Sequence, residues 1–157
     1  MADVNVHDVT FEGPNDDDPP GFRSRWARLG PSLGAAKMGA TVYELPPGEA
    51  ICPYHYEYPN EEWVLVLRGD PVLRTPDGER TLWPGDLVCF PEGPAGAHSV
   101  RGGTETAHVM MLSTKQKPDV SVYPDSDKIG VFPGNDDDTK LFRRRDAVDY
   151  LDGEASP

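Results

Sequence analysis

Short runs of apolar, β-branched and aromatic residues, separated by proline and glycine, dominate the central part of the chain. Such runs occupy residues 41–45, 63–67, 71–74, 80–83, 87–90 and 107–113. These residue types favour strands, and Pro and Gly between them favour turns. No helical period connects the runs, so the pattern predicts an all-β domain, built as a sandwich or a closed barrel.

One hairpin can be placed from local sequence. The stretch TPDGE at residues 75–79 lies between two of the apolar runs. Proline presets φ for a turn and glycine accepts a positive φ, so the two runs are expected to pair as neighbouring antiparallel strands.

The flanking segments divide the chain further. We expect residues 1–21 to form a flexible acidic arm, residues 22–124 the barrel domain, and residues 125–157 an extension that packs on the barrel and ends in a partly disordered acidic tail. Within these ranges, residues 22–30 are predicted to dock as a short strand or turn. Residues 118–135 run over the surface and could cover a barrel edge. Residues 139–151 form a short helix or strand.

The length and net charge of the chain limit the classes of function that it can have. A chain of 157 residues suffices for one domain, and its formal net charge of −12 repels phosphate backbones and anionic membranes. We therefore expect no nucleic-acid partner and no membrane association. The sequence has no bilayer-spanning apolar stretch and no signal-peptide pattern, and its two cysteines do not form a disulfide framework. These features predict a cytoplasmic protein.

The candidate chemistry begins with a histidine and two carboxylates close together in sequence. His55 and Glu57 are two residues apart, so on a strand both side chains point to one face. A turn at residues 59–60 reverses the chain, and Glu62 then opens a strand whose same-side neighbours are Val64 and Val66. A carboxylate on an apolar face is costly unless a cation compensates it. A cation held jointly with His55 and Glu57 would do so.

A second histidine can reach the same place from elsewhere in the chain. The stretch GDLVCFPEGPAGAH, residues 85–98, reads as a strand that ends at Pro91, a loop rich in Gly and Pro, and then His98. If the strands close into a barrel, His98 could supply a fourth ligand from the opposite wall.

Both stretches resemble the two conserved motifs of the cupin superfamily. In GEAICPYHYEYPNEEWVLVLRG, residues 48–69, His55 matches the first histidine, Glu57 stands where the second usually lies, and Glu62 matches the glutamate. In the second stretch His98 fits after a two-residue insertion, and Gly102 replaces the usual asparagine. The chain is most similar to small single-domain bacterial cupins of uncharacterised function.

This resemblance implies a cupin-type double-stranded β-helix, or jelly-roll barrel, with irregular N- and C-terminal extensions. It also implies one divalent metal ion, Mn, Fe, Zn or Ni, on His55, Glu57, Glu62 and His98, and no organic cofactor. The expected function is that of a metal-dependent enzyme acting on a small organic molecule, with oxygenase, isomerase and lyase chemistry all open. The alternative is a module that binds a small ligand without turning it over.

The sequence leaves the roles of Glu57 and His108 open. Glu57 could be a ligand, a general base beside a three-ligand metal, or a group that only hydrogen-bonds in a site without metal. His108, in the run 107–113, is a second acid–base candidate, although a hydrogen-bonded structural role fits it better.

The outward face of the strand that begins at Glu62 is also apolar, because it carries Trp63, Leu65 and Leu67. A second sheet, the terminal segments or a second subunit could cover it, and we predict a symmetric homodimer.

Overall fold

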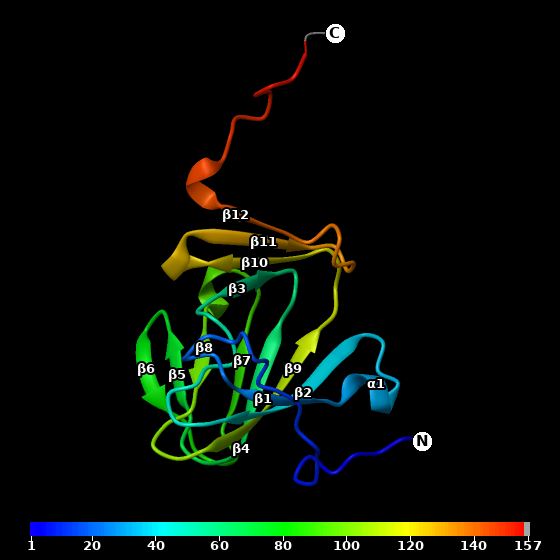
Figure 1. Cartoon of the computed structure of the whole chain (residues 1–157), viewed down its shortest axis with the longest axis vertical. Coiled ribbons are helices and arrows are strands. Elements are labelled where there is room, and N and C mark those ends of the chain that lie inside the picture. The colour runs from blue at the N-terminus through cyan, green and yellow to red at the C-terminus, as the bar shows by residue number, and fades with distance from the viewer. Residues whose placement is uncertain (156–157) are drawn as a thin grey trace.

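Antiparallel strands make up most of the regular secondary structure in a computed structural model that describes residues 1–155 (Figure 1). The predicted all-β class is confirmed. The strands are β1 (Arg25–Arg28), β2 (Met38–Leu45), β3 (Tyr56–Tyr58), β4 (Glu62–Arg68), β5 (Val72–Thr75), β6 (Gly78–Thr81), β7 (Leu87–Phe90), β8 (Ser99–Arg101), β9 (Ala107–Thr114), β10 (Asp119–Tyr123), β11 (Lys128–Phe132) and β12 (Lys140–Arg143). One short helix, α1 (Gly30–Leu33), and the 3-10 turns η1 (Pro94–Gly96), η2 (Pro124–Ser126) and η3 (Arg144–Asp146) join them.

Three sheets surround the interior. The largest has the order β1-β2-β9-β4-β7, and the second has the order β6-β5-β8. The third, β12-β11-β10-β3, combines one strand from the middle of the chain with three from its C-terminal part. In Figure 1 this third sheet lies across one end of the other two, at the end from which the C-terminal residues extend. Residues 118–135, expected to cover a barrel edge, thus supply two of its strands.

The hairpin predicted at TPDGE joins β5 to β6. Thr75 pairs with Gly78, which leaves Pro76 and Asp77 as the loop. Gly78 has a φ of 117°, a value that glycine adopts at little cost. The strand β6 starts earlier than the predicted run at residues 80–83, because pairing begins directly after the two loop residues.

The interior is filled by alternate residues of the strands. Val64 and Val66 of β4 are both buried, and Glu62 begins the same face of that strand. One apolar cluster forms this core: Leu45, Val64, Val66, Leu73, Leu82, Phe90, Val100, Ala107, Val109 and Met111. The strand that carries Glu62 therefore delivers a carboxylate to the rim of an apolar interior.

The outer face of the five-stranded sheet has its own apolar cover. Ala27, Leu29 and Val42 form a second buried cluster, and partly buried residues from the start of the chain pack on it: Val4, Val6, Val9 and Phe11. These residues belong to the predicted flexible arm, which therefore lies against the sheet instead of standing free of it. Leu67 joins the same cluster, so a terminal segment covers that part of the outward face of β4. The homodimer stays a prediction.

The C-terminal extension differs in part from the expected packing. Its strand β11 pairs with both β10 and β12, and Phe132 at the end of β11 reaches the central cavity. Apart from this pairing of β12, residues 141–155 are exposed throughout, so they bury little against the barrel. Within residues 1–155 no helix is long and apolar enough to cross a membrane.

The packed N-terminal segment predicts a stability effect. Phe11 contacts the His108 ring at a centroid distance of 5.0 Å and lies under the Arg25 guanidinium. Phe11→Ala is expected to lower the free energy of unfolding by about 1–3 kcal/mol, measured by chemical denaturation. The exposed Tyr150 offers a matched control, since Tyr150→Ala should change stability by less than about 0.5 kcal/mol. Equal effects of the two substitutions would contradict the packing.

Candidate functional site

Two histidines from distant parts of the chain are held opposite each other by their own backbones. His55 and His98 form an isolated antiparallel bridge. The His55 amide donates to the His98 carbonyl at 3.1 Å, and the His98 amide donates to the His55 carbonyl at 2.8 Å. A pair that exchanges both bonds fixes the two Cα atoms about 5.5 Å apart. The two imidazole rings consequently lie side by side, with centroids 4.9 Å apart.

Each ring is oriented by a carbonyl two residues earlier in the chain. His55 Nδ1 lies 3.0 Å from the Pro53 carbonyl oxygen, and His98 Nδ1 lies 2.9 Å from that of Gly96. A carbonyl oxygen can only accept, so both Nδ1 atoms carry hydrogen. The Nε2 atom of each ring is the one left to face the interior.

The turn before His98 requires a glycine. Gly96 ends η1, and a Cβ at this position would overlap the Pro91 carbonyl oxygen. The two-residue insertion noted in the second motif thus forms a compact 3-10 turn that still delivers His98 to the bridge. The aromatic ring of Phe90 stacks on the His98 imidazole at 3.7 Å and 5°, which fixes the ring from one side.

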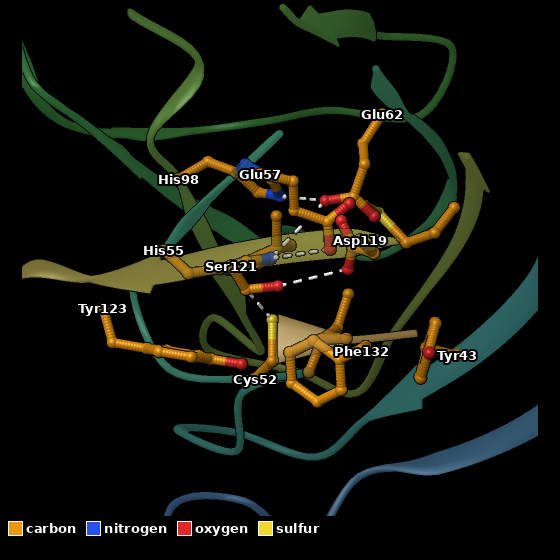
Figure 2. Close-up of a pocket in the computed structure, with 13 residues that line it drawn as sticks. Tyr43, Cys52, His55, Glu57, Glu62, His98, Asp119, Ser121, Tyr123 and Phe132 are labelled. Carbon is orange, nitrogen blue, oxygen red and sulfur yellow. Dashed lines mark hydrogen bonds and ion pairs between the residues drawn. The ribbon is translucent and has the colours of Figure 1, made fainter. Parts of the chain in front are cut away.

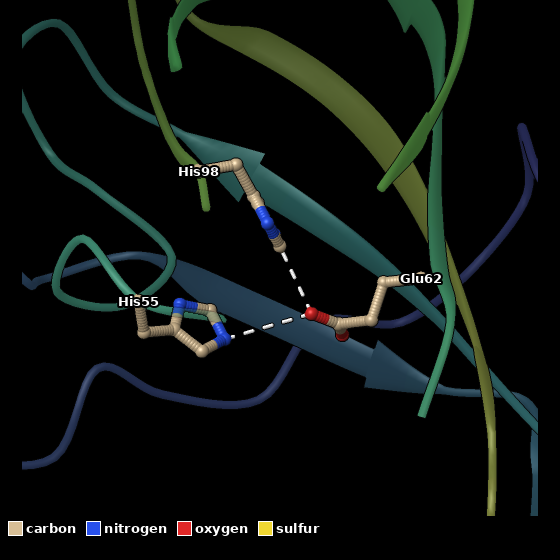
Figure 3. Close-up of side chains that lie close together, drawn as sticks. All are labelled: His55, Glu62 and His98. Atoms are coloured by element: carbon tan, nitrogen blue, oxygen red, sulfur yellow. Dashed lines mark ion pairs between the residues drawn. The ribbon is translucent and has the colours of Figure 1, made fainter. Parts of the chain in front are cut away.

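Glu62 completes the cluster from the start of β4. Its Oε2 lies 3.5 Å from His55 Nε2 and 3.4 Å from His98 Nε2 (Figure 3). These residues form a group whose ligand atoms all lie within 4.8 Å of one another. Two imidazoles and a carboxylate at such distances are a donor set typical of first-row transition metals.

The hydrogen-bonding state of the cluster supports a cation. Glu62 Oε2 and His98 Nε2 are both buried and without a hydrogen-bond partner in the described structure. With Nδ1 protonated, His98 Nε2 presents a lone pair toward a carboxylate oxygen, so two acceptors face each other. Such an arrangement is unfavourable in a buried site unless a positive charge lies between them. The residues present therefore fit a bound metal ion.

Burial and neighbouring charges shift the pKa values of the two histidines in opposite directions in the metal-free protein. Burial, together with the charge of His55, lowers the pKa of His98 to about 4, so His98 is neutral near pH 7. For His55, burial lowers the pKa, but the neighbouring Cys52, Glu57 and Glu62 outweigh burial and the net pKa is raised. A proton on His55 then offsets the two carboxylates, as a metal ion would.

Glu57 lies next to the cluster without being one of its three members. It sits in the middle of β3, and its Oε1 is 3.7 Å from His55 Nε2. The structure thus brings His55, Glu62 and His98 together, with Glu57 reaching them through His55. This placement leaves both roles considered from the sequence open, that of a ligand and that of a base.

His108 lies on the other side of the sheet. Along β9 the buried residues Val109 and Met111 point inward, and His108 points to the outer face. There its Nε2 lies 3.2 Å from Glu44 and 2.9 Å from Arg68. The geometry therefore supports the structural role of His108. The side chain does not reach the cavity, so it cannot serve there as the acid–base group considered as an alternative.

The cluster opens into a cavity of about 320 Å³ (Figure 2). This volume suits a small organic molecule. No lysine or arginine is among the described residues that line the cavity: Tyr43, Ile51, Cys52, His55, Glu57, Glu62, His98, Val100, Met111, Asp119, Ser121, Tyr123 and Phe132. The interior is therefore acidic and partly apolar.

Sequence reasoning missed the contribution of β10. In that strand Asp119, Ser121 and Tyr123 line the cavity, because β10 pairs with β3 in a register that sets Ser121 opposite Glu57. Burial, and then the charge of Glu57, raises the pKa of Asp119 to about 6, against hydrogen bonds from Asn60 and Ser121 that lower it. The alternation of polar and valine residues at 119–123 was the available signal.

A family model described as "Cupin domain" matches residues 41–114. This range contains most of β2, all of β3 to β9 and all four residues predicted as metal ligands. It ends before β10, so Asp119 and Ser121 lie outside it. No curated protein matches the chain.

Solved structures with the same fold are numerous. A candidate sugar phosphate isomerase from Acidithiobacillus ferrooxidans is 30% identical, with 83% of this chain and 82% of that chain covered and a TM-score of 0.75. A cupin-superfamily sugar phosphate isomerase from Silicibacter pomeroyi is 22% identical, with 96% and 98% covered and a TM-score of 0.77. The polyketide cyclase RemF from Streptomyces resistomycificus is 24% identical, with 76% and 83% covered and a TM-score of 0.60. These matches confirm the predicted jelly-roll barrel.

The raised pKa of Asp119 predicts a pH effect on the metal-free protein. Its folded-state pKa of about 6 exceeds the usual 3.8, so the folded state binds this proton more tightly than the unfolded chain does. The folded state must then lose stability as the pH rises between about 4 and 6. Asp119→Asn removes this titration, and its melting temperature should rise relative to wild type from pH 4 to pH 7. A difference that stays constant across this range, as expected for the exposed control Asp146→Asn, would contradict the assignment.

Proposed function

We infer that this chain, which belongs to the cupin superfamily, binds one divalent metal ion on His55, Glu62 and His98 and acts as an enzyme on a small organic substrate. The observation that carries this proposal is the pair of buried, unpartnered acceptor atoms, Glu62 Oε2 and His98 Nε2, that face each other 3.4 Å apart. A cation is the partner that satisfies both atoms at once.

The donor set narrows the choice of metal. Imidazole nitrogen suits Zn, Fe and Ni, and carboxylate oxygen suits Mn, whereas Ca²⁺ and Mg²⁺ take mainly oxygen ligands. Two histidines with one or two carboxylates therefore favour Mn, Fe, Zn or Ni. Three or four protein ligands leave coordination positions open toward the cavity. When bound there, such an ion polarises an oxygen atom of the substrate.

Among the reaction types that the sequence leaves open, we favour isomerisation of a hydroxylated carbonyl compound. The similar protein from Acidithiobacillus ferrooxidans, 30% identical, is a candidate sugar phosphate isomerase. A carbonyl group can move along a carbon chain when a proton leaves one carbon and arrives at the next, a transfer that carboxyl groups can perform. The cavity offers such groups in Glu57 and Asp119.

The charge of the cavity limits which part of the substrate can enter it. Glu57, Glu62 and Asp119 line it, and no lysine or arginine is among the described lining residues. A phosphate dianion would be repelled by these carboxylates. We therefore expect the uncharged, hydroxyl-bearing carbonyl end of the substrate to lie in the cavity.

Elemental analysis tests the metal site. Wild-type protein is expected to hold about one Mn, Fe, Zn or Ni ion per chain. His98→Gln should lower the affinity for that ion by at least about 100-fold, since removing a ligand costs more than disturbing an outer-shell group. His108→Gln is the matched control and should retain the metal, because His108 faces away from the cavity. Wild-type protein with no affinity for these ions would end the proposal.

The role of Glu57 can be separated from that of the cluster. We propose that Glu57 is a fourth ligand, since its Oε1 lies 3.7 Å from His55 Nε2 at the edge of the cluster. Glu57→Gln keeps the shape and removes the charge, so the metal affinity measured by calorimetry should fall by roughly ten-fold. Unchanged affinity together with lost activity would instead identify Glu57 as a base.

A further inference from the structure

Asp119 differs from the other carboxyl groups of the cavity in the contacts that hold it. Glu57 and Glu62 both approach His55 Nε2, at 3.7 and 3.5 Å. Asp119 instead accepts hydrogen bonds from Asn60 Nδ2 at 3.0 Å and Ser121 Oγ at 3.3 Å. Figure 2 shows its carboxyl group directed into the cavity together with Ser121. This group is thus anchored independently of the metal cluster.

The anchor itself is buried and fixed. Asn60 is 6% exposed. Its Oδ1 accepts from the Gln116 amide at 2.8 Å and from Thr114 Oγ1 at 3.1 Å. Because Oδ1 receives these two donors, Nδ2 must point the other way, toward Asp119. Asn60 is therefore a positioning residue that presents one orientation of the Asp119 carboxyl to the cavity.

The register between β10 and β3 places Asp119 along the cavity relative to Glu57, which lies next to the cluster. Ser121 pairs with Glu57 across β10 and β3, and Asp119 is two residues further along the same face of β10. Two residues of a strand span roughly 6.8 Å. Asp119 and the cluster line the same cavity, so a small substrate that contacts the cluster with one end can contact Asp119 with an atom further along its chain.

We propose that Asp119 is the catalytic residue that carries the proton between two carbons of the substrate, a role that rests on the isomerase function proposed above. The Asp119 carboxylate takes a proton from the carbon next to the carbonyl group. The C–H bond breaks, an O–H bond forms on Asp119, and the electron pair moves through the carbon chain to the carbonyl oxygen. The proton held on the Asp119 oxygen exchanges with solvent water, and a proton from Asp119 then passes to the former carbonyl carbon, while a hydroxyl proton moves between the two oxygens and the carbonyl group re-forms one position along. No oxidant or reductant is needed.

Two features favour Asp119 over Glu57 for this step. Negative charge on Glu57 is adjacent to the cluster and is drawn toward a cation there, which weakens it as a base. Asp119 is half-buried, and burial raises the pKa of its carboxyl group, which makes the carboxylate a stronger base than an exposed one.

The experiment measures deuterium uptake from ²H₂O into metal-loaded reactions by ¹H NMR. The probes are D-glyceraldehyde, D-ribose, D-xylose, D-glucose and D-mannose, which carry a hydrogen next to a free or latent carbonyl group. Relative to wild type, Asp119→Asn is expected to lower kcat for exchange by at least about 100-fold, with KM and metal content little changed. Asp119→Glu keeps a carboxyl group in a shifted position and should retain part of the exchange. Asp146→Asn, at a side chain that is 70% exposed, is the control and should behave as wild type.

Each other outcome overturns a defined part of the argument. Exchange by Asp119→Asn within about three-fold of wild type rules out the proton-transfer role and leaves the proposed function standing. A higher KM with unchanged kcat, or loss of metal in Asp119→Asn, would make the residue a binding or structural group instead. Isomer formation without deuterium uptake by the metal-loaded wild type overturns this role but not the isomerase reaction. Neither uptake nor isomer formation with any probe overturns both, and probe binding without either would favour a ligand-binding module.

Discussion

The backbone bridge between His55 and His98 is the contact on which the site depends. It joins segments 43 residues apart through two hydrogen bonds, and each histidine is then oriented by a carbonyl two residues earlier. Because the bridge fixes both Cα atoms and the carbonyls fix both rings, the Nε2 atoms converge without any help from a bound ligand. The site is therefore largely pre-organised, which lowers the ordering cost of binding a metal ion.

The affinity of the cluster for a cation is explained by the position of the Glu62 carboxylate at the rim of an apolar interior. Val64 and Val66 make the inner face of β4 part of the core, and Glu62 begins that same face. A carboxylate in this position is unfavourable by itself, and the neutral His98 beside it offers a lone pair instead of a proton. The fold thus holds two hydrogen-bond acceptors close together in a buried place where a positive charge would stabilise both. The packing of the barrel keeps these acceptors from turning away.

Much of this arrangement could be predicted from the sequence, for reasons of local geometry. The alternation along residues 62–67 predicted both the strand β4 and the inward direction of Glu62, and TPDGE predicted its hairpin. The sequence suggested one strand for His55 and Glu57, whereas His55 lies in the bridge and β3 begins at Tyr56. Both side chains nevertheless line the same cavity, as their spacing predicted.

The contribution of β10 and the packing of the N-terminal segment could not be predicted, because both depend on pairing between distant segments. A run such as residues 119–123 has the alternation of a strand, but nothing in it specifies β3 as the partner. Val4 and Phe11 likewise lie in a polar, acidic stretch whose composition suggests a free arm. Their packing depends on the exposed apolar surface around Val42, which only the assembled sheet creates.

The pocket is assembled from two parts of the chain, a barrel that carries the cluster of His55, Glu62 and His98, and the later strands β10 and β11. The barrel portion lies within the stretch that matches the Cupin domain, whereas Asp119, Ser121, Tyr123 and Phe132 follow it in the chain. Changes in that later segment can alter the wall of the pocket while leaving the His–Glu cluster and its backbone bridge intact. In evolutionary terms, the cluster and the rest of the pocket wall can therefore diverge at separate rates.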